Sequence, residues 1–199
     1  MRILVTGGTG FTGAALVLRL LSAGHSVKSL DYQKGIAWDK LEKEGAELIV
    51  GSVTDKSDVA KSMQNVDMVF HLAAAFRELN VPDKHYYDVN VNGTRNVLEA
   101  AAKRNVLKFV YCSTQGVHGH VSNPPGDENS PISPADYYQQ TKYEGELVVH
   151  EFMKPVSYTP LRAHETVLDL VCRLLLEKKK STTPTYLNSS IHIQSLPTN

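Results

Sequence analysis

Short apolar runs alternate with amphipathic segments along the first three quarters of the chain. The runs are rich in aliphatic and β-branched residues, which is typical of buried strands, whereas apolar positions three and four residues apart predict helices. The expected strands are residues 2–6, 26–31, 46–50, 67–72 and 107–112. The expected helices are residues 11–23, 38–44, 55–64, 83–104 and 136–152.

Strict alternation of strand and helix predicts parallel strands that are joined by right-handed crossovers. The run at 67–72 is apolar on both faces, as expected for a parallel sheet that helices cover on both sides. We therefore expect residues 1–153 to form an α/β domain with a doubly wound parallel sheet.

Composition excludes several classes of protein. The 199 residues contain 21 basic and 21 acidic side chains, so the balanced charge argues against binding nucleic acid or anionic membranes. No apolar run reaches the roughly 20 residues of a membrane-spanning helix.

Two cysteines, Cys112 and Cys172, exclude a disulfide scaffold and a cysteine-rich zinc site. His118 and His120 lack a third ligand, so we predict no metal. The first residues lack the features of a signal peptide, so we expect a cytoplasmic location.

Three glycines separate the first strand from the first helix. Gly7, Gly10 and Gly13 have the spacing of a dinucleotide-binding turn, with Phe11 and Thr12 in the same turn. Glycine permits a tight turn and lets the backbone approach a pyrophosphate, and the helix N-terminus supplies N–H groups for the anion. The alternative is an ordinary glycine-rich loop.

An acidic residue ends the second predicted strand. Asp31 lies 18 residues beyond Gly13, where a carboxylate accepts hydrogen bonds from a ribose 2′-hydroxyl and repels a 2′-phosphate. This position favours NAD over NADP. The alternative is that Asp31 only starts a turn.

A tyrosine and a lysine lie four residues apart on the last predicted helix. Tyr138 and Lys142 therefore share one helix face. We expect the lysine charge to lower the pKa of the phenol from about 10, which makes the tyrosine an acid/base group. Thr114, at the end of the fifth strand, is placed to hold a substrate oxygen, and Ser113 is the second choice. The alternatives are a surface Tyr–Lys pair and hydroxyls that satisfy backbone groups.

These motifs, together with residues 71–75, 90–96 and 117–119, occur in the order found in one family. Residues 1–153 resemble the extended short-chain dehydrogenases/reductases of the NAD-dependent epimerase/dehydratase family, which have a Rossmann fold. The resemblance implies that Thr114, Tyr138 and Lys142 form a catalytic triad and that Asn90 shapes the site. Ser52 replaces an aspartate that usually contacts adenine. The expected cofactor-binding residues are Gly7, Gly10, Phe11, Thr12, Gly13, Asp31, Ser52, Val53, Leu72, Ala73, Ala74, Asn90, Tyr138 and Lys142.

The resemblance also implies a function. We expect an NAD-dependent oxidoreductase, epimerase or dehydratase that acts on a small molecule, a nucleotide-linked sugar. The alternatives are a ketone or hydroxysteroid-type reductase that uses NAD or NADP, and a non-catalytic dinucleotide sensor. The family further suggests a homodimer through the helices that carry Asn96 and Tyr138.

The pattern changes near Lys154. All 13 glycines lie at or before Gly145. Residues 156–180 resemble a reading frame through a sequencing-library adapter, ending in a lysine run that resembles translated poly-A. We expect that the native chain was cut near Lys154, without the family's substrate-binding lobe, and that residues 154–199 are not native. The alternative is a genuine tail with one helix at about 163–178.

Overall fold

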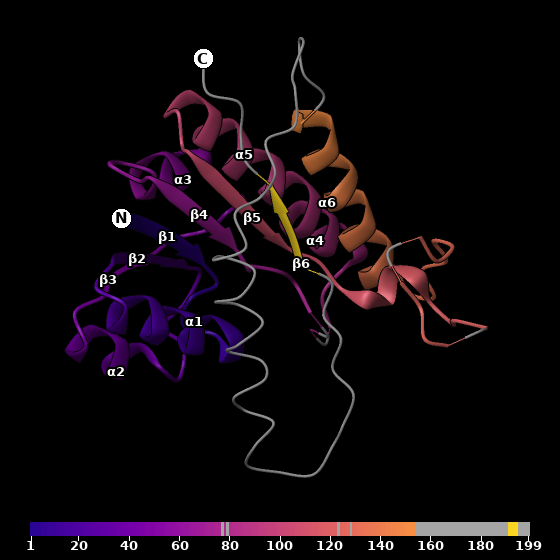
Figure 1. Ribbon diagram of the computed structural model, residues 1–199, viewed down its shortest axis with the longest axis horizontal. Helices are drawn as coiled ribbons and strands as arrows, with labels where there is room; N and C mark the ends of the chain where they lie inside the picture. The colour runs from indigo at the N-terminus through magenta and orange to yellow at the C-terminus, as the bar shows by residue number, and fades with distance from the viewer. Residues whose placement is uncertain (77, 79, 123, 128, 154–190, 195–199) are drawn as a thin grey trace.

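One sheet runs through the molecule in the strand order β3-β2-β1-β4-β5-β6 (Figure 1). The computed structural model describes residues 1–76, 78, 80–122, 124–127 and 129–153 and the backbone of 191–194. Strands β1 to β5 are parallel, and β6 pairs with β5 in the antiparallel direction. The strands are β1 (Arg2–Thr6), β2 (Ser26–Asp31), β3 (Glu47–Val50), β4 (Met68–His71), β5 (Lys108–Cys112) and β6 (Ile191–Gln194).

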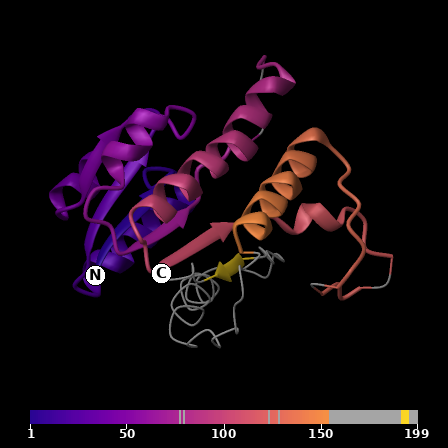
Figure 2. The same cartoon turned by 90° about the horizontal axis from the view of Figure 1, so that it is seen from above.

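Helices cover both faces of the sheet, which confirms the predicted doubly wound α/β architecture. Helices α1 and α2 lie on one face, and α3, α5 and α6 lie on the other (Figure 1). Figure 2 shows α5 and α6 side by side. The helical segments are α1 (Phe11–Ser22), α2 (Trp38–Lys43), α3 (Lys56–Ser62), α4 (Asp83–Tyr87), the π-helix η1 (Asp88–Gly93), α5 (Thr94–Lys103), the 3₁₀-helix η2 (Gln115–His118) and α6 (Tyr137–Met153).

The core has two layers because successive strand residues point to opposite faces. Val69 belongs to the layer beneath α3, α5 and α6, whereas its neighbours Met68 and Phe70 belong to the layer beneath α1. All four residues of β4 are buried, as the apolar pattern predicted. Burying one such side chain contributes about 1.5–3 kcal/mol. The two layers fix the sheet and hence the edge where its parallel strands end.

The helix predicted at residues 83–104 is divided into three segments. Its middle turn is the π-helix η1, and α4 and α5 flank it. At this turn Asn90 is buried, and Gly93 packs so closely on Val53 that a β-carbon on Gly93 would lie 2.7 Å from Val53 Cγ2. Apolar spacing predicts the helical direction of a segment but does not distinguish an α-turn from a π-turn.

Helix α6 ends at Met153. Strand β6 lies within residues 154–199 and was not predicted. The helix expected at about 163–178 lies outside the described residues. Within the described part of the chain, no helix combines the length and apolar character that crossing a bilayer requires.

Candidate functional site

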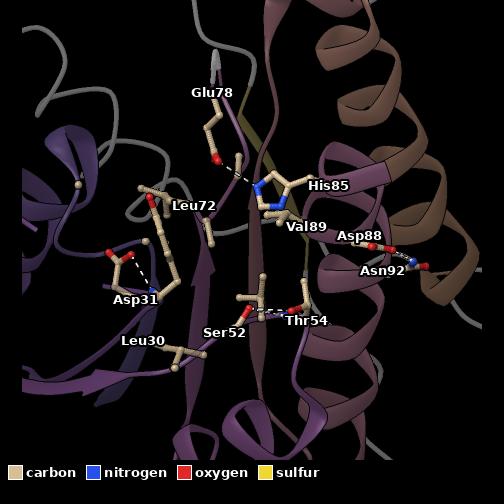
Figure 3. A pocket seen from close by; sticks show the side chains of 17 residues that line it. Leu30, Asp31, Ser52, Thr54, Leu72, Glu78, His85, Asp88, Val89 and Asn92 are labelled. Atoms are coloured by element: carbon tan, nitrogen blue, oxygen red, sulfur yellow. Dashed lines mark hydrogen bonds and ion pairs between the residues drawn. The ribbon is translucent and has the colours of Figure 1, made fainter. Parts of the chain in front are cut away.

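A cavity of about 620 Å³ opens at the carboxyl ends of the first four strands (Figure 3). In the sheet register, Thr6 pairs with both Leu30 and His71, so β1, β2 and β4 end at the same level. The chain order reverses on the two sides of β1, which is where doubly wound sheets bind ligands. The cavity is lined by Gly7, Gly10, Leu30, Asp31, Tyr32, Gly51, Ser52, Val53, Thr54, Leu72, Ala73, Ala74, Glu78, His85, Asp88, Val89 and Asn92.

The glycine turn forms one wall of this cavity. Gly7 has a φ of 71° and donates its N–H to Leu30 O at 2.8 Å. A β-carbon on Gly7 would lie 2.8 Å from Ala73 N, and one on Gly13 would lie 2.1 Å from Gly7 O. No side chain fits at either position, so the tight packing of this turn requires glycine at both.

Helix α1 begins directly after this turn, and its first three residues were predicted to bind cofactor. Gly7 and Gly10 line the cavity, whereas Phe11, Thr12 and Gly13 form the first turn of α1 and are not among the lining residues. Gly13 brings the helix close to the turn, and the N–H groups of this first turn start at the cavity wall.

Asp31 lines the cavity and is held by the glycine turn. Its Oδ2 accepts hydrogen bonds from Thr9 N at 3.0 Å and Thr9 Oγ1 at 2.6 Å, and its Oδ1 accepts one from Tyr32 N at 3.1 Å. The carboxylate therefore has a fixed orientation at the end of β2. It organises the turn and also lines the cavity, so both positions that the sequence proposed for it are compatible with the structure.

The loop after β3 forms the floor of the cavity in Figure 3. The hydroxyl oxygens of Ser52 and Thr54 lie 2.8 Å apart, and Asp58 Oδ2 accepts a hydrogen bond from Ser52 N at 3.1 Å. Asn96 Nδ2 donates to Val53 O at 3.0 Å and ties the loop to α5. Ser52 and Val53, two of the residues predicted to bind the cofactor, thus line the cavity, and Ser52 supplies a hydroxyl rather than a carboxylate.

Sequence reasoning missed the opposite wall. His85 and Asn92 line the cavity from α4 and η1, and Glu78 lies above them (Figure 3). Glu78 Oε2 lies 3.0 Å from His85 Nε2, and Asn92 Nδ2 donates to Asp88 Oδ1 at 3.0 Å. A hydrogen bond from Lys84 lowers the pKa of Asp88. Positions 85, 88 and 92 are three and four residues apart, so the predicted helix already placed them on one face.

The three predicted catalytic residues lie outside the lining of this cavity. Lys142 is 2% exposed, and its Nζ donates to Cys112 O at 2.7 Å and lies 4.3 Å from the centre of the Tyr111 ring. Tyr138 lies one turn earlier on α6, with its ring centroid 4.9 Å from that of Phe76. The lysine is therefore anchored to the end of β5 rather than hydrogen-bonded to the tyrosine.

The pKa of Tyr138 shifts in the direction opposite to the prediction. Burial raises it, and the charge of Lys142, which lowers it, is the smaller influence. The pKa of Lys142 is raised: burial is the largest single influence and lowers it, whereas Tyr111, Cys112 and Tyr138 raise it. The expected effect of the lysine charge is present but does not outweigh the loss of hydration.

The two hydroxyls after β5 have different partners. Ser113 is buried and donates its hydrogen bond to Glu146 of α6. Thr114 caps η2, where its hydroxyl accepts a hydrogen bond from Gly116 N at 3.2 Å. Gly116 in turn packs on the side chain of Gln139, the residue next to Tyr138. The packing of η2 on α6 thus places Thr114 near the start of the tyrosine helix, and Ser113 is committed to a structural contact.

Asn90 connects the segment after β4, which contributes to the cavity wall, with α6, which carries Tyr138 and Lys142. It does not itself line the cavity. It is 1% exposed, its Oδ1 accepts from Ala75 N at 2.9 Å, and its Nδ2 donates to Ala75 O at 3.3 Å and Thr141 Oγ1 at 3.0 Å. These bonds link the segment after β4 to α6. Leu72, Ala73 and Ala74 of that segment, which were predicted to bind the cofactor, line the cavity.

The fold and these motifs together match a known family. The sequence pattern of the NAD dependent epimerase/dehydratase family matches residues 3–165. The chain belongs to this family. The match ends within the segment for which the sequence predicted a different origin.

The relatives of the chain differ from one another in the activity that their names state. The chain is 34% identical over 150 residues to an N-acetyl-alpha-D-glucosaminyl-diphospho-ditrans,octacis-undecaprenol 4-epimerase of Escherichia coli O157:H7, covering 75% of the chain and 43% of the relative. It is 36% identical over 159 residues to a 3 beta-hydroxysteroid dehydrogenase/Delta 5-->4-isomerase of Mycobacterium tuberculosis H37Rv, covering 74% of the chain and 42% of the relative.

A solved structure agrees with the fold. The UDP-glucose 4-epimerase of Thermus thermophilus, in complex with NAD, superposes with a TM-score of 0.68 at 31% identity, covering 76% of this chain and 50% of that one. The chain thus spans half or less of the length of these proteins.

Proposed function

We propose that the chain binds NAD in the cavity at the ends of β1 to β4. The support is the shape of the glycine turn, because a β-carbon on Gly7 or Gly13 would collide with the main chain of Ala73 or Gly7, so the turn can pack this tightly at the cavity wall only with glycine. Asp31 presents a fixed carboxylate to a ribose, and the volume of about 620 Å³ is within the range of cofactor sites. The fold around this cavity fits a dinucleotide.

We infer that Thr114, Tyr138 and Lys142, which lie outside the lining of the cavity, move the substrate proton. When bound, NAD⁺ accepts a hydride from a substrate carbon or NADH returns one. In the reducing direction the neutral Tyr138 would donate its proton to the substrate oxygen as hydride reaches the carbon that bears it, and the oxidising direction is the reverse. Thr114 would hydrogen-bond this oxygen, and Lys142 would stabilise the phenolate that forms. This role is supported by the buried position of Lys142 and by its electrostatic coupling to Tyr138.

The proposed substrate is a nucleotide-linked sugar. Support comes from the similarity to the UDP-glucose 4-epimerase of Thermus thermophilus. A hydroxysteroid or related cyclic alcohol is the second candidate, because the half-exposed ring of Phe76 lies edge-on to Tyr138 and offers an apolar surface beside the phenol. The mycobacterial relative acts on such a substrate by name.

A pair of adjacent tyrosines provides the test. The chain is incubated with NAD⁺ and either UDP-glucose or a 3β-hydroxysteroid, and conversion of the substrate, NADH absorbance and NAD binding are measured. We expect Tyr138→Phe to slow conversion of the substrate by roughly 10²–10⁴-fold while NAD still binds. Tyr137→Phe, one residue away on the same helix and 40% exposed, is the matched control and should leave the rate unchanged. Equal rates in both variants, or no conversion of either substrate, would contradict the proposal.

We also propose that two copies associate through α5 and α6. Support comes from the apolar side chains that α6 exposes, Tyr137 and Leu147. Sedimentation of the purified chain over a range of concentrations tests this, and a monomer at all concentrations would contradict it. Tyr138 and Lys142 lie on the same helix, so the association surface and the catalytic residues share one element.

A further inference from the structure

A buried histidine connects the strand that leads into the glycine turn with the helical segment that follows η1. His71, the last residue of β4, is 1% exposed and lies beside the rings of Phe109 and Tyr111. Its Nδ1 is 2.6 Å from Thr6 Oγ1, and its Nε2 is 3.0 Å from Thr94 Oγ1. Thr6 ends β1, which leads into the glycine turn, and Thr94 follows η1, so one ring bridges both.

The other contacts of the two threonines determine where the ring carries its proton. Thr94 Oγ1 donates its only hydrogen to Asn90 O at 2.7 Å, so towards His71 it can only accept, and Nε2 carries a hydrogen. Thr6 Oγ1 accepts from Ala73 N at 3.2 Å, which leaves its hydrogen for Nδ1. A neutral imidazole protonated at Nε2 satisfies every partner.

The electrostatic environment agrees with a neutral ring. Burial, together with the charge of Lys142, lowers the pKa of His71 from 6.5 to about 3. A protonated ring would place a hydrogen on Nδ1 and force the Thr6 hydroxyl to turn away.

We propose that His71 is a positioning residue that couples the cofactor turn to the catalytic helix. This role rests on the proposed function of Tyr138 and Lys142. The directed chain of hydrogen bonds runs through the atoms Ala73 N, Thr6 Oγ1, His71 Nδ1 and Nε2, Thr94 Oγ1 and Asn90 O.

Both ends of this chain reach residues of the site. Ala73 lines the cavity and lies against Gly7. At the other end, the side chain of Asn90 holds Ala75 and donates to the hydroxyl of Thr141, the neighbour of Lys142. If His71 only filled space, a phenylalanine in its place would serve equally well, since aromatic rings already surround it.

The first test needs neither cofactor nor turnover. Nitrogen-15 NMR of the full chain reports the tautomer of His71 directly. We expect a neutral ring with its proton on Nε2 from pH 8 down to pH 5, well above the pKa of about 3. A proton on Nδ1, or a charged ring at pH 5, would overturn the proposed chain of hydrogen bonds.

The second test separates the two ends of the chain. NAD affinity reports the turn, and the NMR signal of the Tyr138 ring carbon that bears the hydroxyl reports the catalytic helix. We expect His71→Phe to weaken NAD binding about tenfold, as for loss of a buried hydrogen bond, and to shift the Tyr138 signal. His71→Asn keeps an acceptor near Thr6 and should restore affinity, whereas His71→Gln keeps a donor near Thr94 and should restore the Tyr138 signal.

The control is a neighbour on the opposite face of the same strand. Phe70 is 2% exposed and belongs to the other core layer, so Phe70→Leu destabilises β4 without touching the chain of hydrogen bonds. It should leave both signals unchanged. If His71→Phe does not fold, Thr94→Val removes the acceptor for Nε2 and should shift the Tyr138 signal in the same way. An unshifted signal in either variant, or an equal shift in Phe70→Leu, would overturn the proposal.

Discussion

The part of the sheet around β1 and β2 and the part around β4, β5 and α6 position the residues of the site in different ways. Around β1 and β2 the backbone itself is positioned, because Gly7 and Gly13 lack the β-carbons that would collide with neighbouring main chain. Around β4, β5 and α6, buried side chains make the connections, through His71, Asn90 and Lys142. A turn built from backbone is specified by a few consecutive residues, whereas a side-chain network needs partners from distant parts of the chain.

This difference implies different failures on mutation. On the cofactor side a single added carbon meets rigid main chain and cannot be accommodated by a rotamer change. On the catalytic side a lost hydrogen bond leaves a buried polar group without a partner, which costs about 1–3 kcal/mol but leaves the backbone in place. Mutations in the first region should abolish binding, and mutations in the second should disturb geometry.

The largest effect should come from the glycine turn. Gly13→Ala places a β-carbon 2.1 Å from Gly7 O, so we expect a loss of about 3 kcal/mol or more in the free energy of unfolding and no measurable NAD binding. Gly24→Ala is the control: Gly24 has a φ of 80° but no atom within 4 Å of the added carbon. It should cost only about 1 kcal/mol and leave NAD binding intact. Urea denaturation and calorimetric titration measure both, and similar losses in both variants would contradict the steric argument.

A pH-dependent effect is expected on the catalytic side. The pKa of His71 is about 3 in the folded protein and 6.5 in its unperturbed state. Between these values the unfolded chain binds more protons, so stability contributed by the neutral ring is complete above pH 6.5 and is lost as the pH falls towards 3. The expected loss is about 1.4 kcal/mol per pH unit. Urea denaturation from pH 7 to pH 4.5 measures it, and His71→Gln should remove this slope; an unchanged slope in the variant would contradict it.

A smaller effect is expected at Asp31. Asp31→Asn removes the negative charge but keeps an oxygen for Thr9, so the turn should survive. We expect NAD to bind about tenfold more weakly and the preference over NADP to fall, because the carboxylate no longer accepts two ribose hydroxyl bonds or repels a 2′-phosphate. Titration with both dinucleotides measures the change. Unaltered discrimination would show that Asp31 serves only the turn.

The smallest effect should come from a helix cap. Asp55 Oδ1 accepts hydrogen bonds from Ser57 N at 2.7 Å and Asp58 N at 3.3 Å at the start of α3. Asp55→Ala should lower the free energy of unfolding slightly, because it removes the cap of α3, and leave NAD affinity unchanged. Thermal denaturation with and without NAD tests this, and a marked loss of affinity would mean that α3 contributes to the site beyond its fold.

The same contrast explains what could be predicted from the sequence. Strands β1 and β2 and the glycine turn were predicted correctly because their signals are local: apolar runs and a fixed glycine spacing. The cavity wall of His85 and Asn92 was missed, although helical spacing placed both on one face. The lowered pKa expected for Tyr138 was wrong, since burial depends on the packing of Phe76 and other distant residues that spacing does not reveal.

The π-helix η1 also affects how the segment 83–103 tolerates changes in length. A π-turn contains one residue more than the α-turn it replaces, so residues before and after it face directions that a regular helix would not give them. Here His85, before η1, faces the cavity, while Val97 and Leu98, after it, face the core. Deleting one residue within η1 would restore a regular helix yet rotate one of these faces out of alignment. Such a deletion would therefore change which residues of the segment face the cavity or the core, without interrupting the helix.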